Sequence, residues 1–355
     1  MRIFFAGAGT AGHVEPALAV ARWLRHHSPD IELHFLGTEE GVETRLVAAA
    51  GFPLHLITKS PFPRRPSLSA FTWPFRFMKT LRQTQELLVG TDLVIGFGGY
   101  VAAPAYLAAR RTGIPIIAHE ANAKTGLANK LARRCGATLI FALSGKEGER
   151  VGIPLRPEIV ELAALTRSDR LTAKRAALRS MNLDPLAPTI LVFGGSLGSV
   201  KFNETIAEVQ HEISRLGFQI IHAVGGKNKL PVAQAGYFPI SYIEDMASAY
   251  AACDLVISRS GAVTVIETGV LGIYTLYVPL PIGNGEQREN AKVVVEVGGG
   301  EIINNADFSA EWLRINVARV MAAAQRYFTS GVRIDSPLDA GAEIGRRALK
   351  VLDDE

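Results

Sequence analysis

Cysteine is almost absent from this 355-residue sequence, which contains only Cys135 and Cys253. Two isolated cysteines fit no metal-ligand or redox spacing. A disulfide scaffold and a zinc module are therefore excluded, and reduced core thiols in a cytosolic protein are expected. No secretory signal is expected either, because the apolar stretch after Arg2 ends within a few residues in a glycine-rich turn.

Long uncharged runs and blocks of one charge are equally scarce. The runs Leu93–Ala109 and Thr268–Gly285 are interrupted by glycine and proline, so no membrane-spanning helix is expected. No block of lysine and arginine with interleaved aromatic residues resembles a nucleic-acid reader, so no nucleic-acid partner is expected. The net charge of +4 and the pI of 9.1 permit an acidic ligand or an anionic membrane surface.

Hydrophobic residues, at 48%, suffice for a well-buried core, and the length suits two α/β domains. The tetrapeptide Asp92–Ile95 recurs as Asp254–Ile257. Each half also opens with a strand, a glycine turn and a helix: Ile3–Ala6, Gly7–Gly12 and about Val14 to Arg25, then Thr189–Phe193, Gly194–Ser199 and onward from about Phe202. These repeats favour an internal duplication and predict an α/β fold of two doubly wound Rossmann-like domains facing each other across a cleft.

The remaining strands are predicted from short apolar runs that end in turn residues: Ile31–Leu36, Gly51–Thr58 (a helix end and a strand), Ile114–Ala118, Leu139–Leu143, Gln219–Val224, Ile240–Ile243 and Tyr274–Val278. Leu139–Leu143 is expected to be the last strand of the first half. Two prolines stiffen a linker at Gly152–Pro157, and a polar-faced helix is expected over Leu338–Leu352.

The stretch Asp254–Pro281 gives the clearest indication of a ligand site. A buried strand ends in a turn of small residues, Ser258–Gly261, and a helix is predicted over Ala262–Gly269. The backbone N–H groups and the positive dipole end make such a helix N-terminus an anion site. Glu267 on this helix is placed to accept hydrogen bonds from sugar hydroxyls, which predicts a nucleotide-diphosphate pocket. The alternative is a simple βαβ unit with a capped helix and a solvated Glu267.

The segment Ser60–Lys79 places aromatic rings beside cations. Its members are Phe62, Phe71, Trp73, Phe75, Phe77 and Met78, next to Arg64, Arg65, Arg76 and Lys79. Such a surface suits the headgroup layer of an anionic lipid membrane. The alternative is a core helix with a solvated basic edge, although Pro74 argues against a helix that continues through the segment.

Motifs in both halves resemble one family, in the same order along the chain. Gly9–His13 with Pro16, His119–Asn122, Gly194–Gly198 and Ser260–Glu267 are similar to motifs of the MurG family. Its members are UDP-N-acetylglucosamine glycosyltransferases that complete the lipid-linked peptidoglycan precursor. The resemblance covers nearly the whole chain and implies the GT-B fold.

The resemblance also implies a division of labour between the domains. Residues 1–156, with the last helix (337–355) packed back on them, would bind the acceptor, lipid I, at the cytoplasmic face of the membrane. Residues 157–336 would bind UDP-N-acetylglucosamine. The protein would be peripheral to the membrane, which leaves room for other cell-wall and division proteins as partners.

Individual roles follow from the resemblance as well. Thr10, Ala11 and Gly12 would lie in the loop nearest the transferred sugar, and Asn122 would contact that sugar. The remaining donor contacts would come from Arg156, Ser196 (diphosphate), Ile243 (uracil), Ala262, Val263, Thr264, Val265, Ile266 and Glu267 (phosphate and ribose) and Gln287 (sugar hydroxyls).

The residue types also suggest a mechanism. No acidic pair of the DxD kind ends a strand, so no obligatory metal or other cofactor is expected. The helix end near Gly261 would stabilise the leaving diphosphate instead. His13, kept neutral by the dipole of the first helix, is the candidate base, with Glu120 and His119 as rivals. Direct displacement with one base would invert the anomeric centre.

Three other functions are alternatives to sugar transfer, and a feature of the sequence argues against each. A literal G-x-G-x-x-G after a strand also opens NAD-dependent oxidoreductases, but the acid expected about 20 positions on is badly placed at Glu39. A UDP-sugar epimerase has no need of the basic aromatic segment Ser60–Lys79. A non-catalytic nucleotide-binding module at the membrane has no need of the combination His13, Glu120, Asn122 and Glu267.

Overall fold

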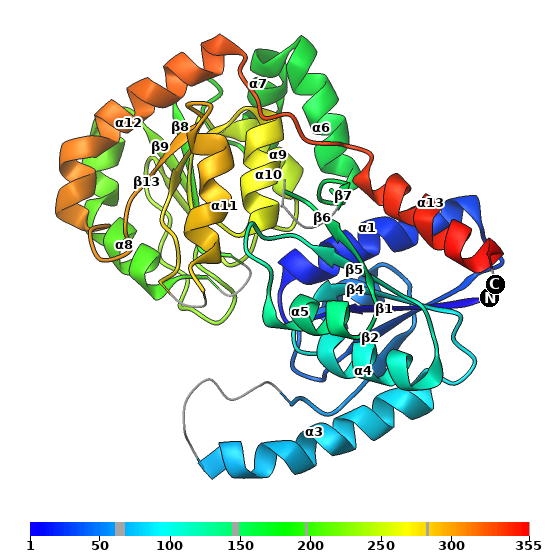
Figure 1. Ribbon diagram of the computed structural model, residues 1–355. Coiled ribbons are helices and arrows are strands. Elements are labelled where there is room, and N and C mark those ends of the chain that lie inside the picture. Colours follow the sequence, from blue (N-terminus) through cyan, green and yellow to red (C-terminus); the bar gives the residue numbers. More distant parts are fainter. Residues whose placement is uncertain (61–67, 144–148, 196–197, 282–283, 355) are drawn as a thin grey trace. The chain divides into compact units, whose positions relative to one another are not determined.

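A computed structural model describes residues 1–60, 68–143, 149–195, 198–281 and 284–354. The chain divides into two compact units (Figure 1). Unit 1 consists of Met1–Arg156 and Pro337–Glu355, and unit 2 consists of Pro157–Ser336. Within the described parts of the chain, no helix is both long enough and apolar enough to cross a lipid bilayer.

Unit 1 is built on a parallel seven-stranded sheet in the order β3-β2-β1-β4-β5-β6-β7. Its strands are β1 (Arg2–Gly7), β2 (Glu32–Gly37), β3 (Leu54–Leu56), β4 (Leu93–Gly98), β5 (Ile116–Glu120), β6 (Thr138–Phe141) and β7 (Glu149–Arg150). Its helices are α1 (Ala11–His27), α2 (Glu43–Ala49), α3 (Leu68–Leu87), α4 (Ala102–Thr112), α5 (Leu127–Arg134) and α13 (Ala340–Asp353).

Alternate residues of β1 enter two different cores, because successive side chains of a strand point to opposite faces. Ile3 and Phe5 pack with buried residues of α1 and with Ile344 of α13. Phe4 and Ala6 pack with buried residues of α3 and α4. Helices therefore cover both faces of the sheet, as in a doubly wound fold. Figure 1 shows α13 running beside α1.

Unit 2 repeats this plan with a parallel six-stranded sheet in the order β10-β9-β8-β11-β12-β13. Its strands are β8 (Thr189–Phe193), β9 (Gln219–Ala223), β10 (Tyr237–Ile240), β11 (Leu255–Ser258), β12 (Tyr274–Tyr277) and β13 (Gly300–Ile302). Its helices are α6 (Pro157–Ser168), α7 (Arg170–Ser180), α8 (Val200–Arg215), α9 (Met246–Ala252), α10 (Ala262–Leu271), α11 (Glu286–Val295) and α12 (Ala310–Ser330).

The repeated tetrapeptide occupies the same place in both sheets. Asp92 directly precedes β4, which lies next to β1. Asp254 directly precedes β11, which lies next to β8. Asp92 Oδ2 accepts a hydrogen bond from Arg2 N (2.6 Å), and Asp254 Oδ2 accepts one from Thr189 N (2.7 Å). Strand order reverses beside this pair in both units, at β1/β4 and at β8/β11. Open α/β sheets bind ligands at the carboxyl ends of such strands. The prediction of two doubly wound Rossmann-like sheets is confirmed.

Three predicted boundaries are wrong. The strand predicted at Ile240–Ile243 lies earlier, at Tyr237–Ile240, and contains Pro239; an edge strand tolerates a residue without an N–H group. Strand β6 is not the last of its half, because β7 follows it, and two exposed residues leave no hydrophobic pattern to detect. Helix α1 begins at Ala11 rather than near Val14, after Thr10 in extended conformation.

The objection to a continuous helix through Pro74 is also wrong, because α3 runs from Leu68 to Leu87 with Pro74 inside it. A proline here removes one backbone hydrogen bond near the helix start. The later turns are anchored independently: Leu81 packs in the core, and Thr80 Oγ1 donates to Thr58 O (2.9 Å). Residues 61–67 of the predicted membrane segment lie outside the described residues.

Candidate active site

The glycine turn of unit 1 lies at the carboxyl ends of β1 and β4 and carries His13 on the first turn of α1. Thr10 caps this helix through its extended backbone, and its Oγ1 lies 3.4 Å from His13 Nδ1. Gly98, with φ of +90°, has no side chain on the side where the imidazole lies; a Cβ there would be 3.4 Å from His13 Nε2. The ring is therefore held between its own turn and the end of β4.

Two histidines of this region are kept neutral by their surroundings. Burial lowers the pKa of His13 to about 4, an effect that the negative charge of Glu43 partly opposes. Burial likewise lowers the pKa of His119, on β5, to about 4. His119 Nε2 lies 2.8 Å from Gly152 O, a bond that orients its ring. His13 is thus unprotonated at neutral pH, as a base must be.

Glu120 is buried and its carboxylate is shared by several donors. Oε1 accepts hydrogen bonds from the backbone N (3.0 Å) and the side chain (3.2 Å) of Asn122. Oε2 accepts from Gly126 N (2.8 Å) and Asn129 Nδ2 (3.0 Å). The structure thus brings the predicted residues Glu120 and Asn122 together, and the carboxylate organises the loop after β5.

Glu43, which no sequence motif indicated, is the most completely enclosed carboxylate of this region, with 0% exposure. Its Oε2 accepts from Gly9 N (3.0 Å), and its Oε1 accepts from Thr38 N (3.0 Å). The hydroxyl of Tyr100 lies 2.7 Å from Thr38 Oγ1 and donates to Glu43 Oε1 at 3.4 Å. An internal anion therefore holds the first glycine turn.

The second glycine turn, in unit 2, is held by a cation. Arg259, at the end of β11, donates to Ser199 Oγ (3.1 Å), Val278 O (2.9 Å) and Asn305 Oδ1 (2.7 Å). Its guanidinium also lies over the ring of Phe202, 4.6 Å from the centroid. All of these partners are neutral. Ser196 of the same turn, a predicted diphosphate contact, lies outside the described residues.

Helix α10 begins three residues after this arginine, at Ala262, and has no side-chain cap. Val265 N donates to Gly261 O (3.0 Å), so the amides of Ala262, Val263 and Thr264 precede the first bond of the helix. The side chains of Val265 and Ile266 are buried in the core. Of the six predicted contact residues of α10, therefore, only the first three offer N–H groups to an anion.

Glu267, also on α10, is 2% exposed and accepts a hydrogen bond from Tyr250 OH (3.0 Å). The alternative that this carboxylate is solvated is therefore wrong. Gln287 on α11 is half-buried, and its Oε1 accepts from Leu280 N (2.9 Å), which ties α11 to the segment after β12. Ile243 is buried in the loop between β10 and α9, and Arg156 directly precedes α6.

Comparison with known proteins decides the family. Residues 3–139 match the N-terminal domain of glycosyltransferase family 28, and residues 189–334 match its C-terminal domain. A protein of Streptomyces coelicolor, named UDP-N-acetylglucosamine–N-acetylmuramyl-(pentapeptide) pyrophosphoryl-undecaprenol N-acetylglucosamine transferase, is 45% identical over 98% of this chain and 94% of its own length. A protein of the same name from Corynebacterium glutamicum is 47% identical over 88% of this chain and 87% of its own length. The crystal structure of Acinetobacter baumannii MurG superimposes with a TM-score of 0.70 at 26% identity, covering 98% of this chain and 99% of that one.

The chain belongs to the MurG family. It is a glycosyltransferase with the GT-B fold, and the resemblance found in its motifs is confirmed. A calicheamicin glycosyltransferase, CalG4, shares the fold alone, with a TM-score of 0.67 at 17% identity. The oxidoreductase, epimerase and non-catalytic alternatives are set aside by membership of the MurG family.

Sequence reasoning missed three residues that organise these MurG-family turns: Glu43, Tyr100 and Arg259. Glu43 had one local signal, because Gly37 and Gly41 shortly precede it, and a Cβ on either would collide with its side chain. Arg259 lies within the turn Ser258–Gly261, which was singled out for its small residues, whereas Tyr100 follows Gly98–Gly99, a turn that the motifs did not include. Among the side chains that the structure describes, no three His, Cys, Asp or Glu residues are grouped as a metal site requires.

Proposed function

We propose that this protein transfers N-acetylglucosamine from UDP-N-acetylglucosamine to the C4 hydroxyl of the muramyl sugar of undecaprenyl-linked lipid I. The product would be lipid II, the precursor of peptidoglycan. The observation that carries the proposal is 45% identity, over 98% of the chain, to a protein named for this transfer. The anomeric centre inverts, because one base and one direct displacement suffice.

Unit 2 binds the donor in this proposal. The uncapped first turn of α10 and the guanidinium of Arg259 provide N–H groups and positive charge for the diphosphate. Ser196 and Arg156 add further contacts, and Ile243 lies against the uracil. Glu267 takes the ribose hydroxyls by exchanging its hydrogen bond from Tyr250, and Gln287 takes hydroxyls of the sugar with its amide.

Unit 1 binds the acceptor and supplies the base. Thr10, Ala11 and Gly12 line the turn beside the transferred sugar, and Asn122 contacts that sugar. His13 removes the proton of the acceptor hydroxyl, because its ring is neutral and the residue is not fully buried. Glu120 is the weaker candidate, since four donors already occupy its two oxygens.

No metal is obligatory in this proposal, because the α10 terminus and Arg259 stabilise the charge of the leaving UDP. We expect turnover to persist in excess chelator. Complete loss of activity in chelator, restored only by a divalent ion, would contradict this expectation.

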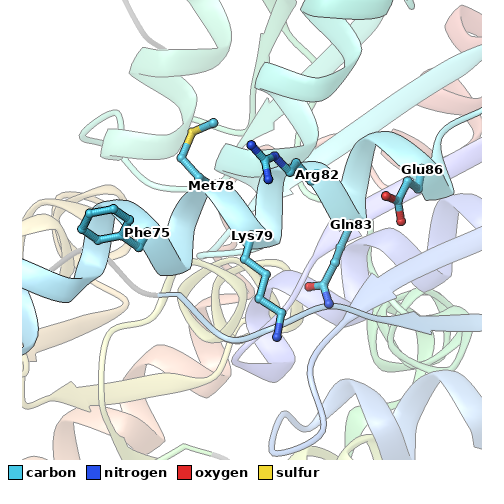
Figure 2. Close-up of a pocket in the computed structure, with 6 residues that line it drawn as sticks. All are labelled: Phe75, Met78, Lys79, Arg82, Gln83 and Glu86. Carbon is cyan, nitrogen blue, oxygen red and sulfur yellow. The ribbon is translucent and has the colours of Figure 1, made fainter.

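In this proposal, unit 1 binds the cytoplasmic face of the membrane through the surface of α3. Phe71 and Phe75 are 81% and 79% exposed, which excludes the alternative that this segment is a core helix. A shallow groove on α3 is lined by Phe75, Met78, Lys79, Arg82, Gln83 and Glu86 (Figure 2). Helices α3, α4 and α5 together carry eight exposed Lys and Arg and a single acid, Glu86. Exposed rings among these cations suit a layer of anionic headgroups.

The test is a transfer assay with radiolabelled UDP-N-acetylglucosamine and a lipid-linked muramyl acceptor. We expect a labelled product that partitions into organic solvent. The variant His13→Ala should lower kcat by at least 100-fold and leave donor affinity within a factor of two. Hydrolysis of the donor without a lipid product would refute the proposed reaction. An unchanged kcat in His13→Ala would transfer the role of base to Glu120.

A further inference from the structure

Glu43 occupies a cavity that the chain builds around it. Gly37 and Gly41 leave room for the carboxylate, because a Cβ on Gly41 would lie 1.9 Å from Glu43 Oε1 and one on Gly37 would lie 2.6 Å from Glu43 Cγ. Thr38 contributes two donors from between these glycines. A carboxylate enclosed in this way is costly to bury unless hydrogen bonds satisfy it, which the surrounding donors do.

The donors come from three separate segments that meet at the carboxyl ends of the strands. Gly9 belongs to the turn after β1, Thr38 follows β2, and Tyr100 follows β4. Gly9 directly precedes Thr10, the cap of the helix that carries His13. The position of the first glycine turn is therefore tied to one charge that does not belong to the turn.

We propose that Glu43 is a positioning residue of the transfer reaction: it holds the turn that carries Thr10 and His13, and its negative charge stabilises the imidazolium that forms on His13. This inference rests on the proposed function, in which His13 is the base. As the acceptor C4 oxygen bonds to the anomeric carbon, the bond to UDP breaks, UDP leaves with the electron pair, and the hydroxyl proton passes to His13. The ring then carries a positive charge, and the negative charge of Glu43 stabilises it electrostatically.

The other charged and titratable groups around His13 and Glu43 are few. His119, on β5, interacts electrostatically with His13, and this interaction adds to burial in lowering the pKa of His119. Tyr100 and Lys59 lie near Glu43, the former by a hydrogen bond and the latter by electrostatic contact. Glu43 is thus the group that opposes the effect of burial on the pKa of His13.

The experiment compares the full-length variants Glu43→Gln and Thr38→Val with the wild type. Glu43→Gln keeps the shape and removes the charge, whereas Thr38→Val removes a hydroxyl that bonds to Glu43 and keeps the charge. We expect Glu43→Gln to lower kcat about 10- to 100-fold, with KM for UDP-N-acetylglucosamine within a factor of two. In the same variant, amide exchange across residues 7–14 should accelerate.

The decisive readout is the protonation of His13, followed by NMR of ¹⁵N-histidine-labelled protein from pH 7 to pH 4. In Glu43→Gln the ring should stay neutral at a pH at which the wild type already titrates, and in Thr38→Val it should titrate as in the wild type. An unchanged His13 titration, or a loss confined to KM for the donor, would overturn the inference. An active His13→Ala variant would instead refute the base assignment, while the titration would still report the link to Glu43.

Discussion

The two glycine turns of this protein have the same place in the fold and opposite electrostatics. The first is tied to the buried carboxylate of Glu43, and the second is tied to the half-buried guanidinium of Arg259. A resident anion satisfies an N–H group that could otherwise face a phosphate, whereas a cation with neutral partners attracts one. A strand–turn–helix motif alone therefore does not decide its ligand; a residue outside the motif does.

A second contrast lies at the amino ends of β4 and β11, where Asp92 and Asp254 directly precede the two strands. Asp92 and Asp254 bond alike to the neighbouring strand, but only Asp254 also receives the ammonium of Lys174, at 2.6 and 2.8 Å. Both side chains of this ion pair are 10% exposed. Unit 2 therefore contains a nearly buried ion pair where the corresponding aspartate of unit 1 accepts a backbone hydrogen bond.

The largest expected effect is on the free energy of unfolding, and it tests the contrast between Asp254 and Asp92. Lys174→Met should destabilise unit 2 by about 3–5 kcal/mol, because it leaves the carboxylate of Asp254 buried without its partner. In unit 1, Asp92→Ala removes the aspartate itself and should cost only about 1–2 kcal/mol, the value of a backbone hydrogen bond at a half-buried site. Urea unfolding of the two variants measures the difference, and equal losses would contradict it.

Acid should weaken both units in the same pH window. Burial lowers the pKa of His119 in unit 1 and of His222 in unit 2 to about 4, from an ordinary 6.5. Between these values the unfolded chain binds a proton that the folded chain does not, so stability falls as pH falls from 6.5 to 4. Each histidine accounts for up to roughly 3 kcal/mol. Unfolding measured at pH 6.5, 5.5 and 4.5 should show this slope, and His222→Asn should flatten it in unit 2 alone.

Donor affinity should separate the two turns. Arg259→Ala should weaken binding of UDP-N-acetylglucosamine about 10- to 100-fold, the loss expected for charge-assisted hydrogen bonds. Arg259→Lys should recover part of the affinity, since the charge remains and the fork of donors does not. Glu43→Gln should leave the affinity within a factor of two. Titration calorimetry measures the affinity of each variant for the donor. Equal losses in Arg259→Ala and Glu43→Gln would contradict the electrostatic difference between the two turns.

The smallest effect concerns the exposed aromatic and basic surface of α3 in unit 1. Lys79→Gln on α3 should weaken binding to anionic phospholipid vesicles by about 1 kcal/mol, roughly fivefold, and the loss should vanish at high salt. Arg326→Gln on α12 of unit 2 removes the same charge from an exposed site and should have no effect. Vesicle co-sedimentation measures both variants. Equal losses would mean that net charge, and not α3, drives binding.

Much of the fold was predictable from local pattern. Buried parallel strands such as Thr189–Phe193 form continuous apolar runs, and this strand matches its prediction at both ends. The strand at Tyr237–Ile240 was misplaced, because edge strands admit a proline that usually marks a break. The helix through Pro74 was missed for the complementary reason, since packing of the later turns outweighs one lost hydrogen bond.

The candidate site was also predictable only in part. Residues adjoining a glycine turn, such as Thr10, His13 and Ala262, were found because strand, turn and helix are contiguous in the chain. Glu43 and Tyr100 were not found, because they lie 34 and 91 residues from Gly9 and reach it only through strand order. The sequence by itself determined two Rossmann-like units, the membership of a family and the turns that can bind a ligand. Only the tertiary structure decided which charge stands behind each turn, because burial and hydrogen-bond partners depend on segments that meet in space and not along the chain.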